Sequence, residues 1–144
     1  MKNRFNKLDS LSSYGVIFIR LAFGFHLLYY SWEPVIHLTA GSSAGFLQKL
    51  GVPFPTLMAW VYTLVEFLGG IALIIGYKTR LVALPLIITF LVAWLGVHLH
   101  DTYKASFQAI QLLAVSFFFL FNGSGALSLD ALLNKGVSAN GESI

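Results

Sequence analysis

The stretch TLMAWVYTLVEFLGGIALIIG, residues 56–76, decides the fold of this chain. It contains a single charged side chain, Glu66, in the middle of the run. At a rise of about 1.5 Å per residue, it is long enough to cross the roughly 30 Å hydrocarbon core of a bilayer. A strand in lipid would leave its edge unpaired, so the stretch predicts a transmembrane helix.

Three more apolar runs of similar length lie around it, at about residues 14–30, 81–98 and 105–121. Gly41-Ser42-Ser43 and Pro53-Phe54-Pro55 interrupt the first connection, and short polar segments at 76–80 and 100–104 form the other two. Asn122-Gly123-Ser124-Gly125 follows the last run, as is typical of a helix end. The sequence therefore predicts an all-α, up-down-up-down four-helix transmembrane bundle. Residues 1–144 are expected to form a single integral membrane domain.

The composition agrees with a lipid environment. Hydrophobic residues make up 57% of the chain and charged residues 10%, with a formal net charge of +3. A soluble domain carries roughly a quarter charged residues, so this chain could not cover a water-facing surface, and the lipid bilayer is its expected partner. No basic stripe indicates nucleic acid. The absence of cysteine excludes thiolate nucleophiles and thiolate metal ligands.

The basic residues predict the orientation. Four crossings place six of them on one side and two, Lys49 and Lys104, on the other. The six are Lys2, Arg4, Lys7, Lys78, Arg80 and Lys135. Because lysine and arginine concentrate in cytoplasmic loops, both termini are expected in the cytoplasm. A cleavable signal peptide is the alternative for the first run, but Arg20 and His26 interrupt it.

Two charged residues lie inside the predicted spans, where they need a partner or a function. Arg20 lies in the first span and Glu66 in the second. We expect both to point inward and to pair across the contact between these helices. Gly24 on the Arg20 face, and Gly69 and Gly70 on the Glu66 face, allow close approach. The pair either fixes the register of the helices or binds a proton or a polar ligand head group.

Histidines gather near the predicted outer ends of the helices. His26 closes the first span, His98 closes the third, and His100 and Asp101 follow. Imidazole serves as a ligand for metals and for haem. However, His98 and His100 would point about 200° apart on a helix, so one helix cannot aim both at one ion. We therefore predict no metal site, with His98, His100 and Asp101 as the weak candidates, and favour interfacial hydrogen bonding.

The fourth span carries a polar stripe. Lys104, Gln108 and Gln111 recur at i, i+4 and i+7 and share one helix face. The two glutamines either hydrogen-bond to a neighbouring helix or line a polar pocket together with Glu66.

Four blocks of sequence, in order, resemble the DoxX family of small bacterial membrane proteins. They are RLAFG at 20–24, GVPFP at 51–55, EFLGGIALIIGYKTR at 66–80 and GSGALSLD at 123–130. Shorter matches between them are Phe46-Leu47, Val97-His98, Asp101 and Tyr103. The resemblance covers nearly the whole chain and implies a four-helix protein of the bacterial inner membrane. It also implies a loose association with quinone-linked oxidation. The chain departs from the commoner family pattern in residues 27–33, and an acid usual near the start of the fourth helix is replaced by Gln108 or Gln111.

Three functions follow as hypotheses. The first is a subunit of a membrane redox system that binds a quinone through Arg20, Glu66 and His98 and receives electrons from a partner protein. The second is a non-catalytic accessory protein that positions another membrane complex. The third, a small-solute carrier, is weaker because no inverted repeat or broken helix is visible. No catalytic motif appears, so whether the chain is an enzyme, and whether it forms a homo-oligomer, stays open.

Overall fold

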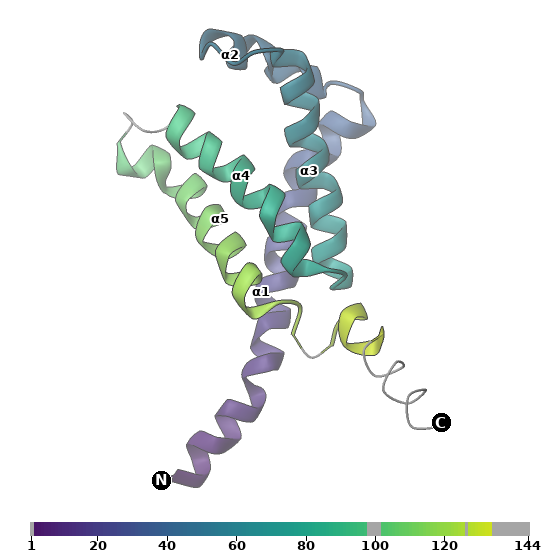
Figure 1. The fold of residues 1–144 in the computed structure, drawn as a ribbon, viewed down its shortest axis with the longest axis vertical. Coiled ribbons are helices and arrows are strands. Elements are labelled where there is room, and N and C mark those ends of the chain that lie inside the picture. Colours follow the sequence, from purple (N-terminus) through teal and green to yellow (C-terminus); the bar gives the residue numbers. More distant parts are fainter. Residues whose placement is uncertain (1, 98–101, 126, 134–144) are drawn as a thin grey trace.

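Four long helices make up most of the chain in the computed structural model, which describes residues 2–97, 102–125 and 127–133. They are α1 (Lys2–Ile36), α3 (Pro55–Ile75), α4 (Thr79–Val97) and α5 (Tyr103–Asn122). Consecutive long helices run in opposite directions (Figure 1). The described ranges contain no strand, so the predicted all-α, up-down-up-down bundle is confirmed.

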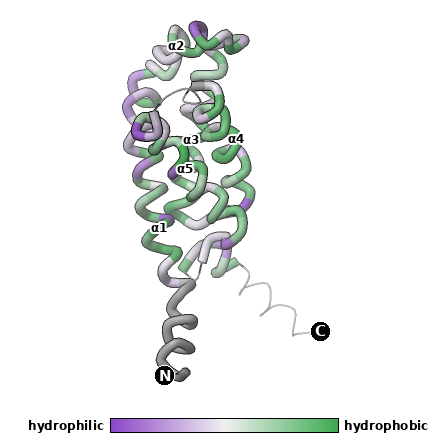
Figure 2. Tube along the Cα trace, turned by 90° about the vertical axis from the view of Figure 1, so that its left-hand side faces the viewer, coloured by the Kyte–Doolittle hydropathy of each residue, from purple (hydrophilic) through white to green (hydrophobic). Residues whose placement is uncertain are grey.

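Each long helix contains a segment that is long and apolar enough to cross a membrane. These segments are Tyr14–Ile36, Pro55–Ile75, Thr79–Gly96 and Tyr103–Asn122. Figure 2 shows hydrophobic residues along much of the bundle. The first helix is longer than the apolar run at 14–30, since it begins at Lys2 and continues through Pro34 to Ile36. An α-helix pairs its own backbone groups and does not need an apolar environment. The helix can therefore extend beyond the apolar run at both of its ends.

The bundle has two different ends. At one, which we call the terminal end, α1 enters and α5 leaves (Figure 1). At the other, the loop end, the short helices η1 (Ala40–Ser43) and α2 (Ala44–Lys49) lie beside the start of α3. A Cβ atom on Gly41 of η1 would lie 3.3 Å from Thr56 and 3.6 Å from Trp60, so η1 rests closely on α3.

Gly76 ends α3 at the terminal end. Its φ of 75° is left-handed, a conformation that glycine adopts without strain. The Tyr77 N–H donates to the Ala72 carbonyl at 2.9 Å and so satisfies one of the last carbonyls of the helix. The turn is short, because α4 already begins at Thr79. This places the C-terminus of α3 and the N-terminus of α4 at the same depth.

The helices α1 and α3 approach each other most closely at two glycines. A Cβ atom on Gly24 would lie 3.0 Å from the Gly70 carbonyl oxygen and 2.7 Å from Ile74 Cγ1. A Cβ atom on Gly70 would lie 2.9 Å from the Gly24 carbonyl oxygen. Small residues at such positions let two helix backbones come together in a membrane. This contact fixes the register of α1 against α3, and so determines which of their residues lie at the same depth in the membrane.

Aromatic rings join α1 to α4 and α5. The Phe23 ring stacks on Phe119 of α5, with centroids 5.9 Å apart and an interplanar angle of 18°. It also lies 6.3 Å from the Phe90 ring of α4 in a tilted arrangement. All three side chains are buried. The remaining buried hydrophobic residues of this core are Leu27, Leu73, Ala83, Leu86, Ile87 and Leu113.

The glycine contact makes a testable prediction. Gly70→Ala places a methyl group 2.9 Å from a backbone oxygen that cannot move away without shifting α1. We expect a loss of about 1–3 kcal/mol, the usual cost of overpacking, measured as a lower thermal unfolding temperature in detergent. Gly96→Ala is the control, because nothing lies within 4 Å of the position that its Cβ atom would take. Equal melting temperatures for the two variants would contradict the contact.

Candidate functional site

A groove of about 470 Å³ runs between α1 and α5. Its walls are mostly apolar, and three polar side chains lie along it. We call it the α1/α5 groove. Its lining residues are Ile19, Ala22, Phe23, His26, Gln108, Gln111, Leu112, Ala114 and Val115. The exposed Ala22 and Ala114 show that the groove opens on the outside of the bundle, where acyl chains surround a membrane protein.

The polar side of the groove brings together three residues that the sequence indicated separately. Gln108 Nε2 lies 3.4 Å from His26 Nε2 and donates to it when the ring carries its proton on Nδ1. The His26 ring also lies 4.7 Å from the Tyr30 ring. Gln111 follows Gln108 by one helical turn and lines the same groove. The predicted interhelical role of Gln108 is thus present, and the residue lines a groove as well.

The two glutamines are exposed on the surface of a span. A polar amide that faces hydrocarbon without a partner is costly. In the part of the chain that the structure describes, Gln108 contacts His26, and no hydrogen bond involves Gln111. The groove therefore presents amide N–H donors to whatever occupies it from outside.

Arg20 does not pair with Glu66, so the predicted ion pair is wrong. Its guanidinium lies at the terminal end and donates to the Ser124 and Leu127 carbonyls at 2.6 Å each. A Cβ atom on Gly76 would lie 2.6 Å from Arg20 Nη1, which places the guanidinium at the end of α3. Glu66 precedes Gly76 by ten residues, or about 15 Å along the helix. The side chain of arginine is too short to span that distance.

Glu66 does point inward, as expected. Its side chain is only 8% exposed, and it shares the buried face of α3 with Thr63, Gly69 and Gly70. Among the described residues no hydrogen bond or ion pair reaches its carboxyl group. Glu66 is not part of the α1/α5 groove, whose lining comes from α1 and α5 alone. Glu66 therefore does not join the two glutamines in this groove, as one of the two alternatives for the polar stripe had predicted.

The comparisons with known proteins identify the family. The model of the DoxX family matches residues 15–99, more than half of the chain. The chain belongs to the DoxX family. It is also 32% identical to the inner membrane protein YqjF of Escherichia coli (strain K12) over 117 residues, which cover 71% of this chain and 86% of that protein. No solved structure matches it.

The three weak metal-ligand candidates of this DoxX protein are close together in sequence. His98, His100 and Asp101 lie outside the described residues. Within the described ranges no group of three or more histidine, aspartate or glutamate side chains could hold a metal ion. Nothing in the sequence indicated the carbonyls of Ser124 and Leu127 as partners of Arg20, because every residue carries a carbonyl.

The separation of the two charges in this DoxX protein can be tested with a double-mutant cycle. Arg20→Gln, Glu66→Gln and the double variant are expected to show additive changes in unfolding free energy, within about 0.5 kcal/mol, because distant residues without shared partners do not couple. Unfolding of the purified protein in detergent measures the four values. A coupling energy above about 1 kcal/mol would instead indicate that Arg20 and Glu66 interact directly.

Proposed function

We propose that this chain is an accessory subunit of a quinone-linked redox system in the bacterial inner membrane. The α1/α5 groove is the proposed place where it holds the head of a quinone. One observation carries the proposal: His26, Gln108 and Gln111 lie along a groove whose other walls are apolar and which opens on the outside of the bundle. The inner membrane location is supported by the relative YqjF, an inner membrane protein of Escherichia coli.

The chemistry of the groove fits a quinone head. A quinone carries two carbonyl oxygens, which accept hydrogen bonds, on a flat ring with an apolar tail. The amide groups of Gln108 and Gln111 donate N–H bonds, and the His26 ring donates from whichever nitrogen is protonated. The Phe23 ring, which stacks on Phe119, also lines the groove and adds an aromatic surface for a flat molecule. A site with few polar groups in an apolar wall is typical of small-molecule sites.

The protein itself supplies no electron carrier in this proposal. The described residues contain no cluster of metal-ligating side chains, and the sequence contains no cysteine. Electrons would come from a partner protein, and the chain would bind and orient the quinone for it. We further propose that both termini face the cytoplasm, because Lys78 lies in the turn at the terminal end and Arg80 lies in the first turn of α4 beside it.

A non-catalytic assembly role is the second candidate, and the exposed face of α1 favours it. Phe18, Phe25, Tyr29 and Trp32 are each more than half exposed. The helix also continues past the other three at the terminal end (Figure 1). Aromatic side chains are enriched at the centres of protein interfaces. In this case α1 would contact a larger membrane complex, and the groove would be part of that contact.

Quinone binding distinguishes the two candidates. A short-chain ubiquinone, titrated into the purified protein, is expected to quench tryptophan fluorescence to saturation. Gln108→Leu should weaken the binding about three- to tenfold, the usual value of one hydrogen bond. Ala114→Phe should abolish it by filling the groove.

Gln48→Leu provides the matched control, because Gln48 is a glutamine of α2, at the loop end of the bundle and outside the groove. It should bind like the wild-type protein. The quinone proposal fails if the wild-type protein shows no saturable quinone binding, or if Ala114→Phe binds quinone like the wild-type protein. Either result would favour the assembly role.

A further inference from the structure

A second cavity, of about 440 Å³, lies at the terminal end of the bundle. It lies between the last turn of α3 and the C-terminal segment 127–132. We call it the terminal cavity. Its lining residues are Arg20, Ile74, Ile75, Leu127, Ser128, Leu129, Ala131 and Leu132. Among the described residues, it shares no lining residue with the α1/α5 groove, and Arg20 is the one charged residue that lines it.

The C-terminal segment is fastened over this cavity by hydrogen bonds. The Asp130 N–H donates to the Gly76 carbonyl at 3.1 Å, and Asp130 Oδ1 accepts the Lys78 N–H at 2.8 Å. The Ser128 hydroxyl lies 3.0 Å from the Gly125 carbonyl and 3.1 Å from the Ser124 hydroxyl. The two Asp130 bonds hold the segment against the turn between α3 and α4, and the Ser128 bonds fix the fold of the segment itself. The wall of the cavity that comes from the C-terminal segment is therefore held in place by specific hydrogen bonds.

The Arg20 cation inside this cavity has solvating partners but no counterion in contact. The side chain is 3% exposed, and two of its five N–H donors bind carbonyls. Its Nε is buried and has no hydrogen-bond partner among the described residues. Asp130 acts on Arg20 electrostatically, but within the described ranges no carboxylate oxygen lies within 4.0 Å of the guanidinium. Carbonyl dipoles lower the cost of the buried charge without neutralising it.

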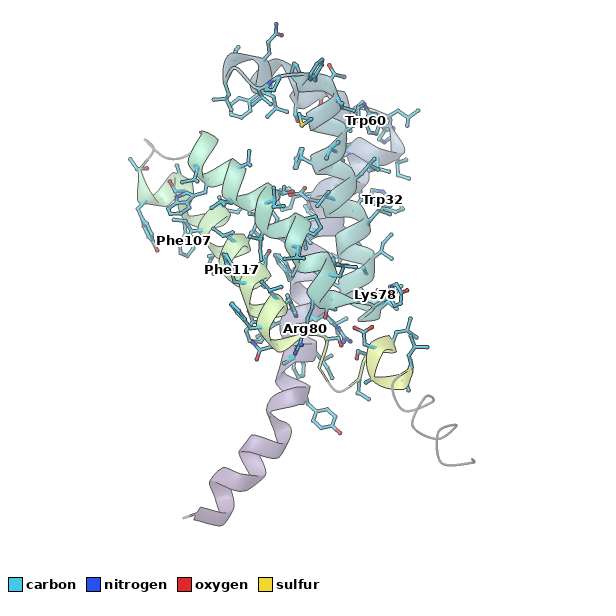
Figure 3. All side chains as sticks on the ribbon, in the orientation of Figure 1. Trp32, Trp60, Lys78, Arg80, Phe107 and Phe117 are labelled. Carbon is cyan, nitrogen blue, oxygen red and sulfur yellow. The ribbon has the colours of Figure 1, made fainter. Side chains whose placement is uncertain are left out.

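The position of the cavity suits a lipid head group. It lies where α3 ends at Ile75 and α4 begins at Thr79, which is where two spans leave the hydrocarbon. Leu127 and Leu132 are 66% and 67% exposed, so the cavity wall faces the medium around the bundle. Lys78, in the turn between these two helices, adds a second basic side chain at this end of the bundle (Figure 3). Basic pockets at the membrane boundary attract anionic lipid head groups.

We propose that the terminal cavity binds one anionic phospholipid. Its phosphate lies against the Arg20 guanidinium and supplies the missing negative charge. One acyl chain covers Ile74, Ile75 and Leu132. A charge-assisted hydrogen bond from arginine to phosphate is among the stronger polar contacts in proteins. This site is independent of the proposed quinone groove, since the two share no lining residue.

The proposal is tested by native mass spectrometry of the purified protein in detergent. The probes are phosphatidylglycerol and phosphatidylcholine with identical acyl chains. Both lipids carry a phosphate, but the choline cation of phosphatidylcholine cancels the negative charge that the Arg20 cation lacks. The wild-type protein is therefore expected to retain one phosphatidylglycerol at least about tenfold better than phosphatidylcholine. Ala131→Phe fills the cavity while leaving the Arg20 hydrogen bonds in place, and should remove this adduct. Arg20→Gln should remove it as well.

Two controls match these variants. Arg80→Gln removes another arginine that binds a helix-end carbonyl, that of Phe121 at 3.3 Å, but it does not line the cavity. Leu133→Phe enlarges a neighbouring side chain outside the cavity. Both should keep the adduct. Equal retention of the two lipids, or phosphatidylglycerol retained by Ala131→Phe, overturns the proposal. Displacement of the lipid by an equal concentration of inorganic phosphate also overturns the proposal, because the site would then recognise phosphate without any contribution from the acyl chains.

Discussion

The close contact between α1 and α3 at Gly24 and Gly70 sets the geometry of the rest of the bundle. It leaves no room for even one methyl group between the two backbones. Once these glycines face each other, the depth of every other residue on both helices is fixed. Arg20 is carried to the end of α3, beside Gly76, and Glu66 stays about three helical turns away. The contact between these two glycines therefore sets the positions of both buried charged residues along the bundle.

The two charges are accommodated in different ways. Arg20 lies at the boundary of the bundle, where α5 has ended and the carbonyls of Ser124 and Leu127 are free to accept its hydrogen bonds. Glu66 lies within a span on the buried face of α3, where the backbone carbonyls and N–H groups are already used by the helices. A long cationic side chain can reach the end of a bundle. A short carboxylate in the middle of a span cannot, so it stays enclosed.

The fold of this protein could be predicted from its sequence, but the pairing of its polar residues could not. Apolar runs long enough for a bilayer, such as residues 56–76, permit little other than helices. Register is different, because two apolar helices can slide past each other by a turn without changing which residues meet lipid. Gly24 and Gly70 were recognisable as a contact, yet their spacing from Arg20 and Glu66 was compatible with a pair. The stripe of Gln108 and Gln111 was predictable from its helical spacing, whereas its meeting with His26 required the position of α5 against α1.

The helix α1 serves both proposed sites, and its geometry keeps them separate. Arg20 lines the terminal cavity and His26 lines the α1/α5 groove. Six residues separate them, which is about 9 Å of rise and a rotation of about 240°. The two side chains therefore point toward different neighbours, α3 with the C-terminal segment in one case and α5 in the other. The charge is confined to the terminal cavity, while the polar residues of the groove are two amides and an imidazole. This division suits an anionic head at the membrane boundary and a neutral carbonyl compound in the groove, farther from the terminal end.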